Sequence, residues 1–199
     1  MKNHSLAAAL EWAEKVHSTQ KWKNTSLPFL HHPLAVAALV LFYGGDFQQA
    51  QAALLHDLIG EGVSCDEIAK QFGEETADLV RAFEDPPEVS VGKWEWSEAK
   101  KAYLKKVESL SERSLLVIAC EELHELTTLN LDLKSLGKDV WKRYPVPGRD
   151  VGWYFRTLLN ILYPKLNEVR SKALVSEFAT QTKLLSNVVF EGMDPSVRN

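Results

Sequence analysis

The stretch "AALLHDLIGEG", residues 52–62, carries a His–Asp pair at the end of an apolar run. His56 and Asp57 stand where a buried helix would normally carry aliphatic side chains. Because an α-helix turns by about 100° per residue, two adjacent side chains can both reach one ion beside it. The dipeptide alone leaves two interpretations open, which are a metal-binding pair and polar groups that cap a helix end.

The sequence on both sides of this stretch predicts helices and no strands. Apolar residues recur at spacings of three and four, as at Leu6, Leu10 and Ala13, which is typical of amphipathic helices. Ser64 and Glu67 form a capping-box pattern, and Pro164 separates the last two helical patterns. The predicted helices cover about 5–20, 32–43, 47–60, 65–72, 74–83, 98–110, 112–136, 150–163 and 165–186. We therefore expect an all-α protein, with 84–97 as a surface loop and 165–190 as the C-terminal helical region.

Composition excludes several classes of function. The 199 residues carry a net charge of −4, so no overall field draws the chain to nucleic acid or to an anionic membrane. Its apolar stretches fall short of the roughly 20 residues that cross a bilayer, and the N-terminus reads as an amphipathic helix rather than a signal peptide. The two cysteines are too few for a disulfide framework. We expect a cytoplasmic protein with reduced thiols, and self-association into a homo-oligomer stays open.

Several further segments follow one another in a recognisable order. They are "AEKVHSTQKWK" (13–23), "LPFLHHPLAVAALV" (27–40), "GGDFQQAQAALLHDLIGEG" (44–62), "EIAKQFGEETADLV" (67–80), "VIACEELHELTTL" (117–129) and "GWYFRTLL" (152–159). In this order they resemble the HD-domain phosphohydrolases, in particular the hydrolase domain of RelA/SpoT proteins and the small alarmone hydrolases. The resemblance covers roughly 10–160 and implies one all-α HD domain over 1–199. It also implies a metal-dependent phosphohydrolase acting on a nucleotide-type phosphoester, related to guanosine 3′,5′-bis(diphosphate) 3′-pyrophosphohydrolase.

The resemblance implies a ligand set for one divalent metal ion, which is Mn²⁺ in the alarmone hydrolases. His32 matches the first metal histidine of the family, and His56 and Asp57 match its HD pair. Glu121 stands where the family has its last aspartate ligand. Such an ion lowers the pKa of a bound water and neutralises the negative charge that develops on a phosphate.

The same resemblance suggests which side chains contact a phosphorylated small-molecule substrate. Lys21 and Lys23 lie in the loop before the metal histidine and are candidates for holding phosphate, although a solvated charged loop is an equal interpretation. Arg149 and Arg156 lie where the family's C-terminal helices approach the pocket, which makes them candidate phosphate contacts.

The sequence departs from the family pattern at positions that carry chemistry. The family's Glu–Asp pair after the HD motif is Gly60–Glu61 here, so Glu61 is the candidate catalytic residue that handles the proton of water. The family's asparagine in the pocket is Glu125, which repels phosphate but can accept a hydrogen bond from a base or sugar. Glu122 replaces the family's arginine.

These departures leave three outcomes open within the family. The chain is an alarmone hydrolase with a rearranged base, a phosphohydrolase that has moved to a less anionic phosphoester, or a nucleotide- or metal-binding module that has lost hydrolysis. A fourth interpretation lies outside the family. Glu14 with His17, and Glu121 with His124, are two Glu-x-x-His motifs on predicted helices, which is half of a ferritin-like di-iron site.

Overall fold

The computed structural model describes residues 5–23, 25–86, 89 and 95–190, and these residues form helices joined by short turns. The helices are α1 Leu6–His17, α2 His31–Phe42, α3 Phe47–Leu55, η1 His56–Glu61, α4 Cys65–Phe72, α5 Glu74–Arg81, α7 Trp96–Val107, α8 Glu112–Leu136, η2 Gly137–Arg143, α9 Gly148–Leu162 and α10 Val169–Phe190. Within the described ranges no strand occurs, apart from an isolated bridge between Lys21 and Pro28. The all-α prediction is confirmed.

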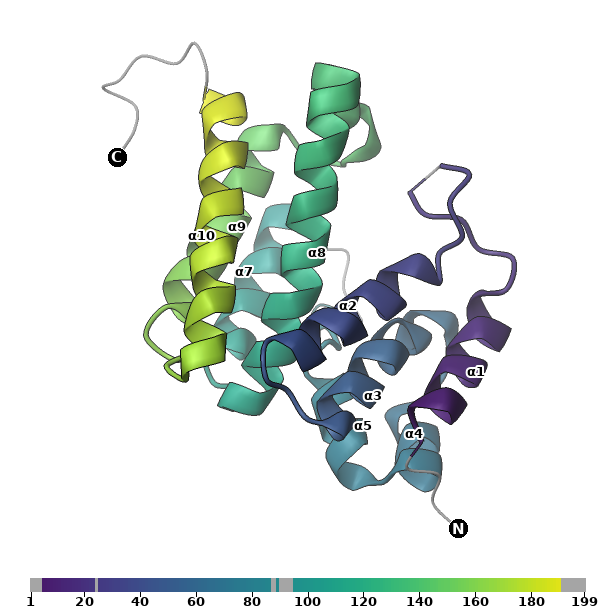
Figure 1. Cartoon of the computed structure of the whole chain (residues 1–199). Coiled ribbons are helices and arrows are strands. Elements are labelled where there is room, and N and C mark those ends of the chain that lie inside the picture. Colours follow the sequence, from purple (N-terminus) through teal and green to yellow (C-terminus); the bar gives the residue numbers. More distant parts are fainter. Residues whose placement is uncertain (1–4, 24, 87–88, 90–94, 191–199) are drawn as a thin grey trace.

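The helices form two groups that meet along α8 (Figure 1). In the first group α3 packs against α1, α2 and α5, and α4 packs against α5. In the second group α10 packs against α8 and α9, and α7 packs against α9. Because α2 and α3 both contact α8, side chains from the two groups meet beside the middle of this long helix.

The helix predicted at 47–60 changes its winding where the His–Asp pair begins. Asp46 and Gln49 cap the start of α3 with a reciprocal pair of hydrogen bonds. The α-helical winding ends at Leu55, and the chain continues as the 3₁₀ helix η1 up to Glu61. The backbone then turns at Gly62, whose φ of 87° lies in the left-handed region that favours glycine. Since a 3₁₀ helix has about three residues per turn, adjacent side chains diverge by about 120° rather than 100°.

Other predicted boundaries move by a few residues. The first helix ends at His17 instead of residue 20, and α7 spans Trp96–Val107 instead of 98–110. The helix predicted at 165–186 begins at Val169, because the turn after Pro164 extends to residue 168, where the Asn167 amide donates to the Pro164 carbonyl. In the predicted loop 84–97, residues 87–88 and 90–94 lie outside the described residues.

Two findings bear on the predictions from composition. Among the described residues, no helix combines the length and the apolarity that crossing a membrane would require. Cys65 and Cys120 are both buried and both free of disulfide bonds.

Candidate metal centre and the cavity beside it

Four histidine and carboxylate side chains converge where α2, the end of α3 and α8 meet. His32 lies in the first turn of α2, and His56 and Asp57 open η1. The Nε2 atoms of the two histidines are 3.3 Å apart. Asp57 Oδ2 lies 3.2 Å from His56 Nε2 and 3.6 Å from His32 Nε2. Glu121, in the middle of α8, places its Oε1 4.0 Å from His32 Nε2.

The hydrogen bond on the far side of His56 fixes which nitrogen faces this group. His56 Nδ1 lies 2.8 Å from the carbonyl oxygen of Ala53. A carbonyl can only accept, so Nδ1 carries the proton and Nε2 of the neutral ring presents a lone pair. Asp57 Oδ2 is buried and has no hydrogen-bond partner among the described residues. Electron-rich atoms therefore converge at one point, which is the arrangement that a cation would stabilise.

The donor set fits a divalent transition metal. Two imidazoles and a carboxylate suit Mn, Fe or Zn. Ligand atoms about 2.1 Å from one ion lie roughly 3.0–3.4 Å apart, close to the separations among His32, His56 and Asp57. A second overlapping group combines His32 with Glu121 and Glu125. The described residues thus contain groups that could hold one divalent ion.

Burial favours the neutral forms of His32 and His124. It lowers the pKa of His32, and the neighbouring His56 and His124 lower it further. The pKa of His124 falls to about 4, first through burial and then through His31 and Lys23. Neutral imidazoles at neutral pH are the form that binds metal.

The side of His32 that faces away from Asp57 is closed by packing. The ring of Trp22 stacks on His32 with centroids 4.7 Å apart and an angle of 27° between the planes. His124 Nδ1 lies 2.8 Å from His32 Nδ1. Trp22 is 3% exposed, so this face of the metal group has no room for a substrate.

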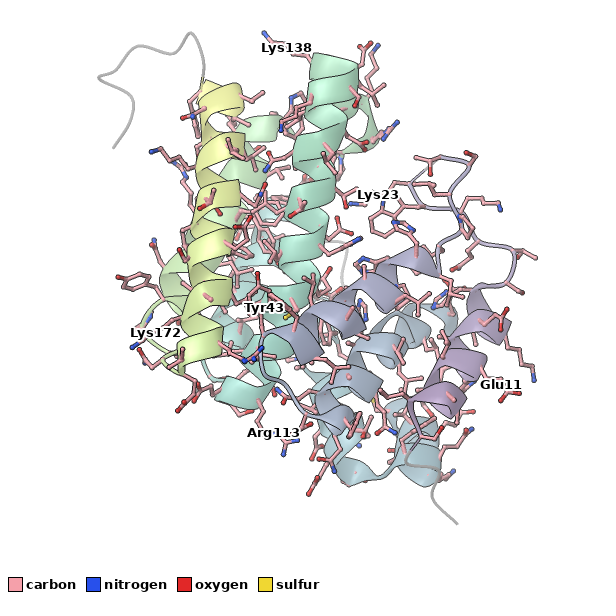
Figure 2. All side chains as sticks on the ribbon, in the orientation of Figure 1. Glu11, Lys23, Tyr43, Arg113, Lys138 and Lys172 are labelled. Carbon is pink, nitrogen blue, oxygen red and sulfur yellow. The ribbon has the colours of Figure 1, made fainter. Side chains whose placement is uncertain are left out.

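Lys23 forms an ion pair with Glu125 instead of pointing into an open pocket. Figure 2 shows Lys23 reaching from the loop before α2 toward α8, where its Nζ contacts Glu125. Its ammonium also lies 4.8 Å from the ring centroid of Trp22 and 5.6 Å from that of Tyr144. Burial alone would lower the pKa of Lys23, but Glu125 and Tyr144 raise it, so the side chain stays charged. Two residues predicted to contact substrate therefore neutralise each other.

A cavity of about 760 Å³ opens on the other side of the metal group, against His56, Asp57 and Glu121. Its wall includes apolar and aromatic side chains such as Phe83 and Tyr103. The carboxylates of its lining are those of Asp57, Glu84, Asp85, Glu121 and Glu122, and among the described residues the lysine or arginine of the lining is Lys100.

The buried end of this cavity is held by contacts from α9 and α7. The hydroxyl of Tyr154 donates to Glu122, and the ammonium of Lys100 lies 4.8 Å from the centroid of the Tyr154 ring. Burial raises the pKa of Glu122, although Lys100 and Tyr154 oppose the shift. Burial also raises the pKa of Glu121 well above its ordinary value, and Glu122, Glu125 and Asp57 add to the effect. The ionised forms of these carboxylates would repel one another, and a bound cation would relieve that repulsion.

Several residues predicted to act in the site lie outside the cavity lining. Glu61 is exposed, whereas its neighbour Gly60 lines the cavity. Lys21 is exposed. Arg149 Nε lies 3.6 Å from Asp150 Oδ1, and the guanidinium carbon of Arg156 lies 4.7 Å from the centroid of the Phe190 ring. Their roles in catalysis and phosphate binding stay predictions that these positions do not favour.

Sequence reasoning missed Lys100, Glu84 and Tyr103 as cavity residues. Lys100 is one of several charges on α7, and nothing in the local sequence distinguishes it from a solvated lysine.

The di-iron interpretation fails because its residues do not lie together in the structure. Among the described residues, the groups that could hold a metal include neither Glu14 nor His17, and His17 instead bonds to Gln20.

Comparison with protein families agrees with this fold. The HD domain model matches residues 9–143, so the chain belongs to the HD domain family. The chain is 28% identical over 145 residues to the Xenopus tropicalis guanosine-3′,5′-bis(diphosphate) 3′-pyrophosphohydrolase MESH1, covering 71% of this chain and 76% of that protein. It is 34% identical over 128 residues to the Aquifex aeolicus guanosine-3′,5′-bis(diphosphate) 3′-pyrophosphohydrolase, covering 62% of this chain and 18% of that protein.

Two solved structures share the fold. A crystal structure of a Listeria monocytogenes protein superposes with a TM-score of 0.68 at 27% identity, covering 76% of this chain and 96% of that one. A structure described as a metazoan ortholog of SpoT that hydrolyzes ppGpp gives a TM-score of 0.69 at 20% identity, covering 90% and 96%. The matches to bacterial relatives span 10%, 28% and 18% of the length of the first three.

Proposed function

We propose that this chain is a metal-dependent phosphohydrolase that acts on a nucleotide-type phosphoester. The observation that carries the proposal is the buried Asp57 Oδ2, which has no hydrogen-bond partner among the described residues and lies 3.2 Å from His56 Nε2 and 3.6 Å from His32 Nε2. Membership of the HD domain family and the pyrophosphohydrolase names of several relatives support the same reaction class.

His32, His56, Asp57 and Glu121 would hold one divalent cation. The donor set suits Mn, Fe or Zn, and our assignment is Mn²⁺ because the resemblance to the alarmone hydrolases implies it. When bound, such a cation polarises a phosphate and lowers the pKa of water. The chain's own groups orient the substrate against it. Lys100 offers positive charge to a phosphate oxygen, and Tyr103 and Phe83 give the cavity an apolar wall for the rest of the molecule.

The proton of the attacking water needs an acceptor within the cavity. Glu61 would have to turn from solvent to reach it, whereas Glu122 is buried and lines the cavity. Burial raises the pKa of Glu122, which suits a carboxylate for accepting a proton near neutral pH. We therefore favour Glu122 for this role over the Glu61 that the sequence suggests.

A screen for released phosphate and pyrophosphate tests the proposal. The protein is loaded with Mn²⁺ and incubated with nucleoside mono-, di- and triphosphates and guanosine 3′,5′-bis(diphosphate), with His56→Ala as the inactive control. We expect release from at least one substrate by the wild type and none by the variant. If the metal-loaded protein releases no phosphate or pyrophosphate from any of these substrates, the second candidate is favoured, a nucleotide- or metal-binding module. The glycine at position 60 also favours it.

The class of binding partner and the cellular location are proposed from the net charge and the free thiols. With a net charge of −4 and no basic surface required by the site, we propose a small-molecule partner and neither nucleic acid nor a membrane surface. The two buried free thiols are consistent with our proposal of a cytoplasmic protein.

A further inference from the structure

We propose that the cavity beside the metal group selects phosphoesters that carry one phosphate group over those that carry several. The observation is that the cavity beside the metal group is lined by five carboxylates. Among the described lining residues, one lysine accompanies them. The inference rests on the proposed phosphohydrolase function and names its substrate class, a nucleoside monophosphate or a comparable monoester.

The first step is the direction of approach. Trp22 is stacked on His32 and buried, and His124 bonds to the same ring from behind. Lys23 is paired with Glu125, so its ammonium is not free to bind phosphate on that side. A substrate therefore reaches the metal group through the cavity that Asp57 and Glu121 border.

The second step is the balance of charge along that route. Glu84 and Asp85 are exposed carboxylates on that route, and beside the divalent cation the described lining residues offer the positive charge of Lys100. A monoester dianion can lie between the cation and Lys100, where both attract it. Each further phosphate would have to lie against Glu84 or Asp85, where like charges in a partly enclosed space repel it.

The third step is the reaction itself. In hydrolysis of a monoester the oxygen of water forms a bond to phosphorus, and the ester bond between phosphorus and oxygen breaks. The proton released by water is passed to the departing alkoxide, and the products are an alcohol and inorganic phosphate. This reaction needs no oxidant, reductant or second substrate, and it places one phosphate group beside the metal ligands.

Charge-neutral variants of the outer carboxylates test the selection. Glu84 and Asp85 are exposed residues that line the cavity, and Glu84 accepts a hydrogen bond from the Cys65 thiol at 3.3 Å. In the double variant Glu84→Gln and Asp85→Asn, both side chains keep an acceptor oxygen and lose their charge. The matched control, Glu11→Gln with Glu14→Gln, removes the same charge from exposed positions of α1 that lie outside the lining.

The first measurement is the ratio of kcat/KM for guanosine 5′-monophosphate to that for guanosine 3′,5′-bis(diphosphate), with Mn²⁺ present. We expect a ratio of at least about ten for the wild type and the control, and a ratio lowered at least about threefold in the cavity variant. A wild-type ratio of one or less would overturn the proposal, as would a cavity variant that leaves the ratio unchanged. If the wild type hydrolyses the bis(diphosphate) in preference to the monophosphate, this inference is overturned, but the proposed phosphohydrolase function still stands.

A binding measurement separates this inference from the activity. Inorganic phosphate and tripolyphosphate are titrated into the Mn²⁺-loaded protein by calorimetry, with free Mn²⁺ held constant. We expect phosphate to bind more tightly than tripolyphosphate. The ratio of the Kd for tripolyphosphate to the Kd for phosphate should fall at least about threefold in the cavity variant but not in the control. Tighter binding of tripolyphosphate by the wild type would contradict the inference even if no substrate were turned over.

Discussion

The Nδ1 atoms of His32 and His124 lie 2.8 Å apart, so one of these rings donates a proton to the other. If His32 is to offer the lone pair of its Nε2 to a metal ion, the proton must lie on its own Nδ1, and His124 must accept. If the proton lies on His124 instead, His32 Nε2 carries a hydrogen and can donate to His56 Nε2, 3.3 Å away. His124 thus helps to set which tautomer of His32 is present.

Replacing His124 should weaken metal binding without removing a ligand. In His124→Leu the Nδ1 of His32 loses its acceptor, and we expect a loss of about 10- to 100-fold in metal affinity. In His124→Asn the side-chain carbonyl can still accept, so part of the affinity should return. The measurement is a titration with Co²⁺ followed by visible absorption. An affinity in His124→Leu equal to that of the wild type would show that His124 does not position His32.

Metal removal should destabilise the fold, because Asp57 Oδ2 would then stay buried without a partner. A ligand that binds only the folded state at 100 times its Kd adds about 2.7 kcal/mol to the free energy of unfolding. We therefore expect Mn²⁺ to raise the Tm of the chelator-treated wild type by several degrees, and to leave His56→Ala unchanged. Equal shifts in both proteins would mean that the ion binds elsewhere.

His124 should lower the stability of the metal-free protein in mild acid. Its pKa falls from the ordinary 6.5 to about 4 in the folded state. Between these two values His124 binds more protons in the unfolded chain, so its contribution to the free energy of unfolding decreases as the pH falls from about 6.5 to 4. The raised pKa values of Glu121 and Glu122 act in the opposite direction, so the wild type is compared with His124→Asn. Urea unfolding at pH 7.5, 5.5 and 4.5 should show that the wild type loses more stability on acidification than the variant. An equal pH dependence in the two proteins would contradict the lowered pKa of His124.

Substitutions of Glu122 and Glu61 should affect kcat differently, which shows which residue accepts the proton of water. Glu122→Gln keeps an oxygen for the Tyr154 hydroxyl but removes the base, so we expect kcat to fall by about 100-fold or more. Glu61→Gln, at an exposed position outside the cavity lining, should retain kcat within about twofold. Rate measurements on the two matched variants decide between them. The reverse pattern would return the role to Glu61.

The sequence predicts the fold class and the approximate helices because apolar spacing and capping residues are local signals. It also places His32, His56 and Asp57 within one candidate group, since two recognisable motifs carry them. It does not predict that the helix tightens after Leu55, because the 3₁₀ segment ends at the turn at Gly62 and packs against α1, which is distant in the sequence.

The pairing of Lys23 with Glu125 is equally out of reach from the sequence. Each residue alone is a plausible substrate contact, and their mutual neutralisation appears when α8 is packed beside the loop before α2. The position of Lys100 is not predicted for the same reason, since the Tyr154 ring beside its ammonium comes from another helix, α9. Long-range contacts of this kind leave no periodic pattern.

The central claim is that His32, His56, Asp57 and Glu121 hold one divalent metal ion. Elemental mass spectrometry on protein purified from cells grown with manganese tests it most directly, with His56→Ala measured in parallel. We predict about one transition-metal ion per wild-type chain and a metal content near zero in the variant. A wild type as free of metal as the variant would contradict the claim.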